Sequence, residues 1–200
     1  MESRKLLYDY LIENTSLSDK EAEMICSYTE TEELKKGDYF QKEGCPVTRF
    51  GFLCNGLVKE EITNPNGRKC NNRFIWRGKF LTDYGGYLFK QPARYGLCAI
   101  IPSKVLFITI RNIEMLKGYI PTLGNVLESL ACRTLVEQKY EGARVWLFSL
   151  KERYCFFTKA FRDIDPYLSE SDRASYLHIT LSSFSRFKRK YFQSLRRGVI

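Results

Sequence analysis

The chain of 200 residues contains 44% hydrophobic and 28% charged residues, which is the profile of a folded globular protein and excludes a disordered or collagen-like chain. This length is typical of one or two domains. The formal net charge of +9 favours a polyanionic partner such as nucleic acid.

Two short helices are predicted at the amino-terminal end of the chain. Apolar side chains recur at helical spacing within residues 4–28, and Ser18 followed by Glu21 is the capping-box pattern that opens the second helix. Charged residues interrupt the apolar ones, so the segment lacks the apolar core of a signal peptide. No stretch is apolar over the roughly 20 residues that a membrane helix needs. We therefore expect a cytoplasmic protein without a membrane partner.

The segment from Leu34 to Ile110 has the pattern of an antiparallel β structure. Short apolar and β-branched runs alternate with glycine turns, which is typical of a β sandwich or barrel. Asn55-Gly56 and Asn64-Pro65-Asn66-Gly67 each lie between two such runs, so we predict consecutive hairpins there. The periodicity becomes helical after the last run, which makes residue 111 a candidate boundary.

A long helix is predicted over residues 121–147. Pro121 is compatible with the first helical turn. Four side chains then follow at spacings of four, three and four residues, namely Leu123, Leu127, Leu130 and Thr134. Such a stripe packs either on its own domain or on a second copy of the chain. We predict a homodimer through this helix and keep packing on its own domain as the alternative.

The carboxyl-terminal segment, residues 149–200, is predicted to be a small basic helical domain. It holds eleven Lys or Arg against five Asp or Glu, and no acidic residue follows Asp172. Ser149 with Glu152, and Ser169 with Asp172, are capping-box patterns, each of which opens a helix. The excess of positive charge at this end favours a polyphosphate partner.

Two of the predicted helices match a helix-turn-helix. Thr180 is predicted to cap the second one, which carries Leu181, Phe184 and Phe187 on one side and polar or basic residues elsewhere. A short turn followed by a basic helix is the arrangement that places the second helix in the DNA major groove. His178 lies in the turn, where a left-handed conformation is needed that histidine adopts more readily than most residues. We interpret His178 as structural.

Six segments of the sequence, taken together in chain order, carry a resemblance to a known family. The carboxyl-terminal ones are Glu152-Arg153-Tyr154, Ala174-Ser175-Tyr176-Leu177-His178-Ile179-Thr180 and Phe184-Ser185-Arg186-Phe187-Lys188. Those of the β-rich part are Leu34-Lys35-Lys36-Gly37-Asp38-Tyr39-Phe40, Glu43-Gly44 and Phe52-Leu53-Cys54-Asn55-Gly56-Leu57-Val58. They resemble the Crp/Fnr family of bacterial transcription regulators, especially its divergent branch common in Bacteroidetes. The similar segments extend over about residues 30–190.

The resemblance implies an α+β protein with three parts. Residues 1–115 are expected to form a sensor domain, an antiparallel β jelly roll of the cyclic-nucleotide-binding type with flanking helices. Residues 116–148 are expected to form a long dimerisation helix, and residues 149–200 a helix-turn-helix domain that binds DNA. The same partition follows from periodicity and charge.

The positions that would bind a cyclic nucleotide depart from the family pattern. The resemblance implies a glycine-glutamate pair for the ribose and an arginine-serine pair for the phosphate. Thr82 and Asp83 stand at the first pair, Ala93 stands at the arginine position, and Arg94 comes one residue late. If this segment is a strand, a shift of one residue turns the side chain to the opposite face unless a bulge re-aims it. A buried phosphate needs a charge-assisted partner, so we expect no binding of cyclic AMP.

We expect no bound cofactor in this pocket. It is expected to be filled by aromatic side chains, to take another small-molecule effector, or to be empty. Three tyrosines are candidates to fill it, namely Tyr84, Tyr87 and Tyr95.

For the second helix of the helix-turn-helix, the resemblance implies contacts with double-stranded DNA. Thr180 would face a phosphate, and Leu181, Ser182 and Arg186 would meet base edges. Three further side chains, Lys188, Arg189 and Lys190, are candidates for phosphate contacts or for a solvated face. Ser183 completes the predicted DNA-binding set.

These observations predict a regulator that binds a specific DNA sequence as a homodimer and responds to an effector other than cyclic AMP or to none. The alternative is a sensor module that binds a ligand or a protein through a degenerate pocket and does not read DNA sequence. Seven scattered cysteines, one histidine and the lack of a Gly-rich phosphate loop or a Gly-x-Ser-x-Gly motif predict neither a metal site nor catalysis.

Overall fold

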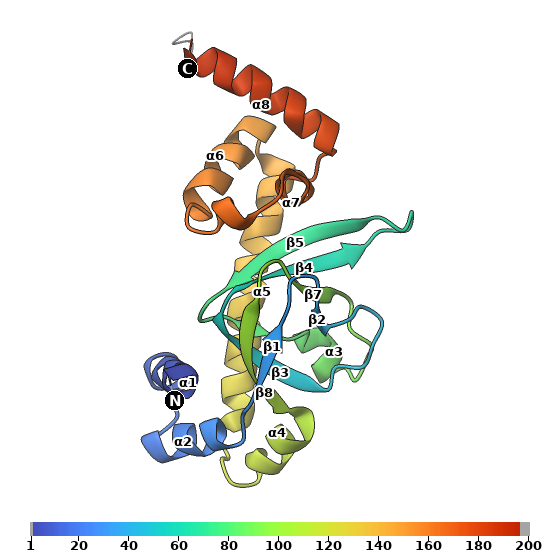
Figure 1. The fold of residues 1–200 in the computed structure, drawn as a ribbon. Helices are drawn as coiled ribbons and strands as arrows, with labels where there is room; N and C mark the ends of the chain where they lie inside the picture. Colours follow the sequence, from blue (N-terminus) through green and yellow to red (C-terminus); the bar gives the residue numbers. More distant parts are fainter. Residues whose placement is uncertain (1, 197–200) are drawn as a thin grey trace.

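The computed structural model describes residues 2–196, which form an α+β fold with a β sandwich at its centre (Figure 1). The strands are β1 Glu30–Leu34, β2 Tyr39–Gln41, β3 Arg49–Asn55, β4 Leu57–Thr63, β5 Lys69–Trp76, β6 Phe80–Leu81, β7 Gly96–Ala99 and β8 Ser103–Thr109. The α-helices are α1 Glu2–Asn14, α2 Asp19–Ser27, α3 Tyr84–Leu88, α4 Ile110–Lys117, α5 Leu123–Leu147, α6 Leu150–Ala160, α7 Glu170–Tyr176 and α8 Leu181–Arg196. A 3₁₀ turn, η1, covers Asp165–Tyr167.

The strands form two antiparallel four-stranded sheets, in the orders β1-β8-β3-β6 and β2-β7-β4-β5. Their inner faces pack together, and every strand contributes a buried apolar side chain to the core between them, among them Leu53, Val58, Ile75 and Val105. The antiparallel sandwich predicted for this segment is therefore confirmed.

One of the two predicted hairpins is wrong. β4 and β5 pair across residues 64–67 as predicted, but β3 pairs with β6 and β8 rather than with β4. Gly56 instead leads the chain from one sheet to the other, with φ at +109°, and a Cβ at this position would overlap Ser103. The Ser103 hydroxyl accepts a hydrogen bond from the amide of Leu57 at 3.2 Å. The Asn-Gly signal marks a change of direction but does not specify the partner strand.

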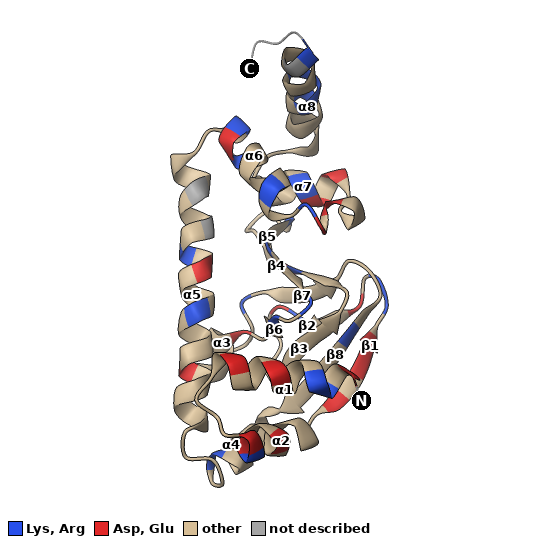
Figure 2. Cartoon of the chain, turned by 90° about the vertical axis from the view of Figure 1, so that its left-hand side faces the viewer, with Lys and Arg blue, Asp and Glu red and all other residues tan. Residues whose placement is uncertain are grey.

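The outer face of the β1-β8-β3-β6 sheet is covered by helices (Figure 2). Leu7 and Leu11 of α1 join Phe52 and Leu106 of the sheet in one buried cluster, to which α2, α4 and the first half of α5 also contribute. The predicted stripe on α5 belongs to this cluster, with Leu123 and Leu130 buried and Leu127 packed against them. Thr134 donates to the carbonyl of Leu130 within the same helix. The structure thus selects the alternative in which this stripe packs on its own domain.

The carboxyl-terminal helices share a core with the sandwich. Phe157, Phe161 and Phe184 are buried in one cluster with Leu57 and Phe74 of the strands. The capping boxes predicted at the starts of α2, α6 and α7 are all present. Within the described residues, no helix is long and apolar enough to cross a membrane.

Candidate DNA interface and sensor pocket

α7 and α8 form a helix-turn-helix at the end of the molecule farthest from α1, α2 and α4 (Figure 1). His178 adopts the left-handed conformation expected for the turn, with φ at +55°. The amide of Ile179 then donates to the carbonyl of Ala174 at 3.0 Å, which closes the end of α7. Thr180 caps α8, because its hydroxyl accepts a hydrogen bond from the amide of Ser183 at 3.2 Å.

The buried face of α8 is aromatic. Phe184 is fully buried, and both it and Phe187 pack against Tyr154 of α6, with ring centroids 6.0 and 5.3 Å apart. Leu181, predicted on the same side of the helix, is instead 46% exposed. The prediction failed because Leu181 lies in the first turn of α8, one turn before the contact with α6 begins.

The opposite face of α8 is exposed and carries basic residues. Ser182, Arg186, Arg189 and Lys190 are exposed on it, and Arg186 and Arg189 are neighbours because residues three apart share a helix face. Lys188 is different, since it forms an ion pair with Glu170 of α7. The structure therefore brings together four of the eight predicted DNA-binding side chains on one outward face, while Lys188 is held against α7.

The helix-turn-helix is attached to the sandwich through β5, the edge strand of its sheet. The amide of Asn71 donates to the hydroxyl of Ser175 at 2.7 Å, and the Asn71 side chain donates to Asp172 at 3.1 Å. Lys59 of β4 lies 3.2 Å from the same carboxylate. These contacts fix α7 against the edge strand. Spacing in the sequence gives no sign of them, because about 100 residues separate the partners.

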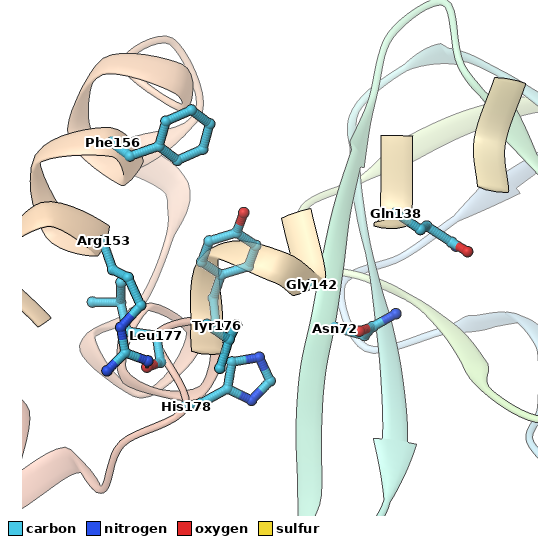
Figure 3. Close-up of a pocket in the computed structure, with 9 residues that line it drawn as sticks. Asn72, Gln138, Gly142, Arg153, Phe156, Tyr176, Leu177 and His178 are labelled. Carbon is cyan, nitrogen blue, oxygen red and sulfur yellow. The ribbon is translucent and has the colours of Figure 1, made fainter. Parts of the chain in front are cut away.

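A cleft lies where α5, β5, α6 and the turn after α7 meet (Figure 3). Arg153 and His178 line one side, and Gln138 and Asn72 line the other. Arg153 donates to the carbonyl of Leu177 at 2.7 Å, so it braces the turn before α8. The cleft encloses about 40 Å³, enough for a few water molecules and far below the roughly 300 Å³ of a small-molecule site.

The predicted ligand-pocket residues come together between β6, α3 and β7. Thr82 and Asp83 are buried, and the Asp83 carboxylate accepts hydrogen bonds from the amides of Gly86 and Arg94 at 3.0 and 2.7 Å. Ala93 is buried, whereas the Arg94 side chain is exposed. The chain at Arg94 is a bend rather than a strand. No basic side chain of this segment therefore points into the sandwich.

Tyrosines fill part of the space beside this segment. Tyr95 donates to the carbonyl of Thr82 at 3.0 Å, and the ring of Tyr84 packs edge-on against Phe50 at 5.6 Å. Burial raises the pKa of both phenols. The ring of Tyr87 packs edge-on against the same Phe50 at 4.9 Å, and its hydroxyl donates to Glu114 of α4.

Sequence reasoning missed a buried ion pair in the same region. Glu60 of β4 is fully buried, and Arg73 of β5 lies 3.3 Å from its carboxylate. Burial raises the pKa of Glu60, Arg73 opposes the shift, and the nearby Asp83 adds to it. No pattern could have identified Glu60, since Lys59-Glu60-Glu61 is a run of charged residues typical of an exposed strand.

Comparisons with known proteins bear on the fold. No family model and no curated protein matches the chain. Solved structures do match. FixK2 from Bradyrhizobium japonicum superposes with a TM-score of 0.70 at 19% identity, covering 85% of this chain and 86% of that one.

Two further solved structures cover a similar share of the chain. The c-di-GMP responsive global regulator CLP of Xanthomonas campestris gives a TM-score of 0.73 at 12% identity, with coverage of 88% and 93%. The catabolite activator protein of Thermus thermophilus gives 0.57 at 16% identity, with coverage of 92% and 86%. The chain has the Crp/Fnr fold.

Proposed function

We propose that the chain is a sequence-specific, DNA-binding transcription regulator of the Crp/Fnr type that acts as a homodimer. The observation that carries the proposal is the outward face of α8, the second helix of a helix-turn-helix, where Arg186 and Arg189 are exposed beside Ser182. A helix of this kind enters the major groove with its first turns against base edges. Arg186 carries the planar, bidentate donor group that pairs with guanine.

The amino-terminal turn of α8 supports a phosphate contact. Free backbone amides and the helix dipole favour an anion at this end, and Thr180 fixes the turn through its bond to the amide of Ser183. Phosphate contacts set the position of the helix, and base contacts set the sequence. The two kinds of contact have different consequences when they are removed, which defines the test.

The test is selection of genomic fragments by the purified protein, followed by salt titrations of the best fragment and of random DNA. We expect a twofold-symmetric site bound about 10³-fold or more above random sequence. Arg186→Ala should cost roughly 1–3 kcal/mol on that site and relax the preference at one base pair. Arg162→Ala, which removes an equal charge from an exposed arginine outside α8, should leave the preference unchanged. Equal, salt-sensitive binding to all fragments would contradict the proposal.

The second half of α5 supports the homodimer. Beyond the buried stripe, this helix exposes several large apolar side chains, namely Leu135, Val136, Tyr140, Trp146 and Leu147. They occupy the side of the helix away from the sandwich core. Exposed apolar side chains on a helix that leads to the DNA-binding domain are suited to an identical helix of a second copy. Two α8 helices would then reach half-sites one helical turn of DNA apart.

The buried charges of the sandwich argue against cyclic AMP as the effector. Glu60 and Asp83 are two buried acids, and the guanidinium of Arg73 lies 3.3 Å from the Glu60 carboxylate. The Asp83 carboxylate accepts hydrogen bonds from the backbone amides of Gly86 and Arg94. An entering phosphate would meet negative charge and no unused cation, and desolvating it there would be unfavourable. The regulator would respond to another molecule or to none.

A further inference from the structure

The first turn of α8 differs from the rest of its exposed face in chemistry. The hydroxyls of Thr180, Ser182 and Ser183 are bonded to one another, at 3.1 Å for Thr180 and Ser182 and 2.9 Å for Thr180 and Ser183. The hydroxyl of Ser185 donates to the carbonyl of Leu181 at 3.1 Å. These four hydroxyls are therefore engaged within the helix, and using one to read a base requires breaking or sharing an existing bond.

Leu181 is the apolar exception in this turn. It is 46% exposed and does not belong to the aromatic core beneath α8. Residues three and four apart share a helix face, so Leu181 continues the row of Ser185 and Arg189, next to the row of Ser182 and Arg186. Leu181 is thus an apolar group on the face that carries the basic side chains, at the end of the helix that lies deepest in a groove.

We propose that Leu181 is a specificity-determining residue that contacts the 5-methyl group of a thymine in the major groove, beside the guanine read by Arg186. This inference rests on the proposed function. The thymine methyl is the apolar group on the major-groove edges of unmodified DNA. Leucine has no donor or acceptor, so placing a polar base edge against it leaves that edge without a partner, at a cost in free energy. The half-site would therefore contain a required thymine.

The experiment removes the methyl group alone. In the operator obtained by selection, each thymine of one half-site is replaced in turn by deoxyuridine, and affinity is measured for the wild-type protein and for Leu181→Ala. We expect one position at which the wild type loses about fourfold in affinity, the value for one buried methyl group, while Leu181→Ala binds thymine and uracil equally. At that position, 5-methylcytosine paired with guanine should bind the wild type more tightly than cytosine does.

Two controls separate a base contact from a general loss of apolar surface. Phe192→Ala removes a side chain of the same 46% exposure from the last turns of α8 and should retain the full effect of deoxyuridine. Leu181→Met keeps an apolar side chain and should retain it as well. A specific operator whose binding is insensitive to every methyl group, or equally sensitive in Leu181→Ala, would overturn the inference and leave the proposed function intact. Failure to select any operator would overturn both.

Discussion

The contact between α7 and the edge strand allows the coupling of the helix-turn-helix to the sandwich to be predicted. The Asp172 carboxylate accepts hydrogen bonds from Lys59 and Asn71 of the sandwich and from Ser169 of its own capping box. The side chains of Asp172 and Lys59 are 15% and 23% exposed. The energy of their ion pair should therefore lie between that of exposed pairs, which contribute roughly 0.2–1 kcal/mol, and that of buried pairs, whose disruption costs roughly 3–5 kcal/mol. We expect an interaction energy of about 1–2 kcal/mol.

A double-mutant cycle with Lys59→Met and Asp172→Asn isolates this energy. Single variants are not enough, because Lys59 also lies 3.3 Å from Glu61 and Asp172 also caps α7. The free energy of unfolding of the four proteins is measured by urea denaturation. The cluster shared between the sandwich and α6–α8 should make unfolding of the two parts cooperative, so the stability of the whole chain reports the contact.

The matched control is the ion pair of Lys188 with Glu170, which lies within the helix-turn-helix and is more exposed, at 31% and 45%. A cycle with Lys188→Met and Glu170→Gln should give less than about 0.5 kcal/mol. The reasoning is refuted if the Lys59–Asp172 cycle gives no more than this control. In that case burial between α7 and the sandwich would not strengthen the ion pair.

Three further outcomes are expected. A ligand at 100 times its Kd stabilises the folded protein by about 2.7 kcal/mol, or roughly 5–10 °C in Tm for a chain of this size. Cyclic AMP at millimolar concentration should give no shift in Tm. A shift of that size would contradict the charge argument around Asp83. Tyr140→Glu should yield monomers in light scattering, whereas Tyr119→Glu, at the same 69% exposure, should not, and identical masses would exclude the α5 interface. Burial opposes the shift, but the bonds from Ser169 and Asn71 and the charge of Lys59 lower the pKa of Asp172. The ionised Asp172 therefore stabilises the fold above its unfolded pKa, about 3.9, and this stabilisation is lost as the pH falls below that value. The difference in the free energy of unfolding between wild type and Asp172→Asn should shrink below about pH 4. A difference that is constant with pH would be inconsistent with this pair.

Features set by neighbours in the sequence were predicted well. The capping boxes at Ser149 and Ser169 need only residues three apart, and both are present. The left-handed turn at His178 is also local, since its geometry depends on the few residues between two helices. Short apolar runs separated by glycine turns predicted an antiparallel β sandwich or barrel, and the structure is a sandwich. For the caps and the turn, the interaction that decides the structure lies within one or two turns of chain.

Features set by distant contacts were not predictable in the same way. The partner of β3 depends on which sheet each strand joins, and the Asn55-Gly56 signal is the same for either choice. Glu60 can be buried because Arg73 of the neighbouring strand forms an ion pair with its carboxylate and Asn72 donates a hydrogen bond to it. Leu181 is exposed although Phe184, one turn later, is buried against Tyr154 of α6. The apolar pattern gave the faces of α5, but only the packed structure identifies which face is covered by the sandwich and which is left exposed.

The sandwich is connected to the helix-turn-helix by two physical routes. One is α5, which packs on the sandwich through Leu130 and continues to residue 147. The other is β5, an edge strand. The backbone amide of Asn71 in this strand donates to the hydroxyl of Ser175 of α7, where a strand inside a sheet would pair with a neighbouring strand. Phe74 of β5 also stacks on Tyr176, with ring centroids 5.2 Å apart. Because α7 is bonded to the strand itself rather than to a loop, a change in the path of β5 moves α7, and α8 moves with it through the turn at His178. A change in the sandwich near Arg73, which lies in the same strand, would therefore reach α8 without first changing α5.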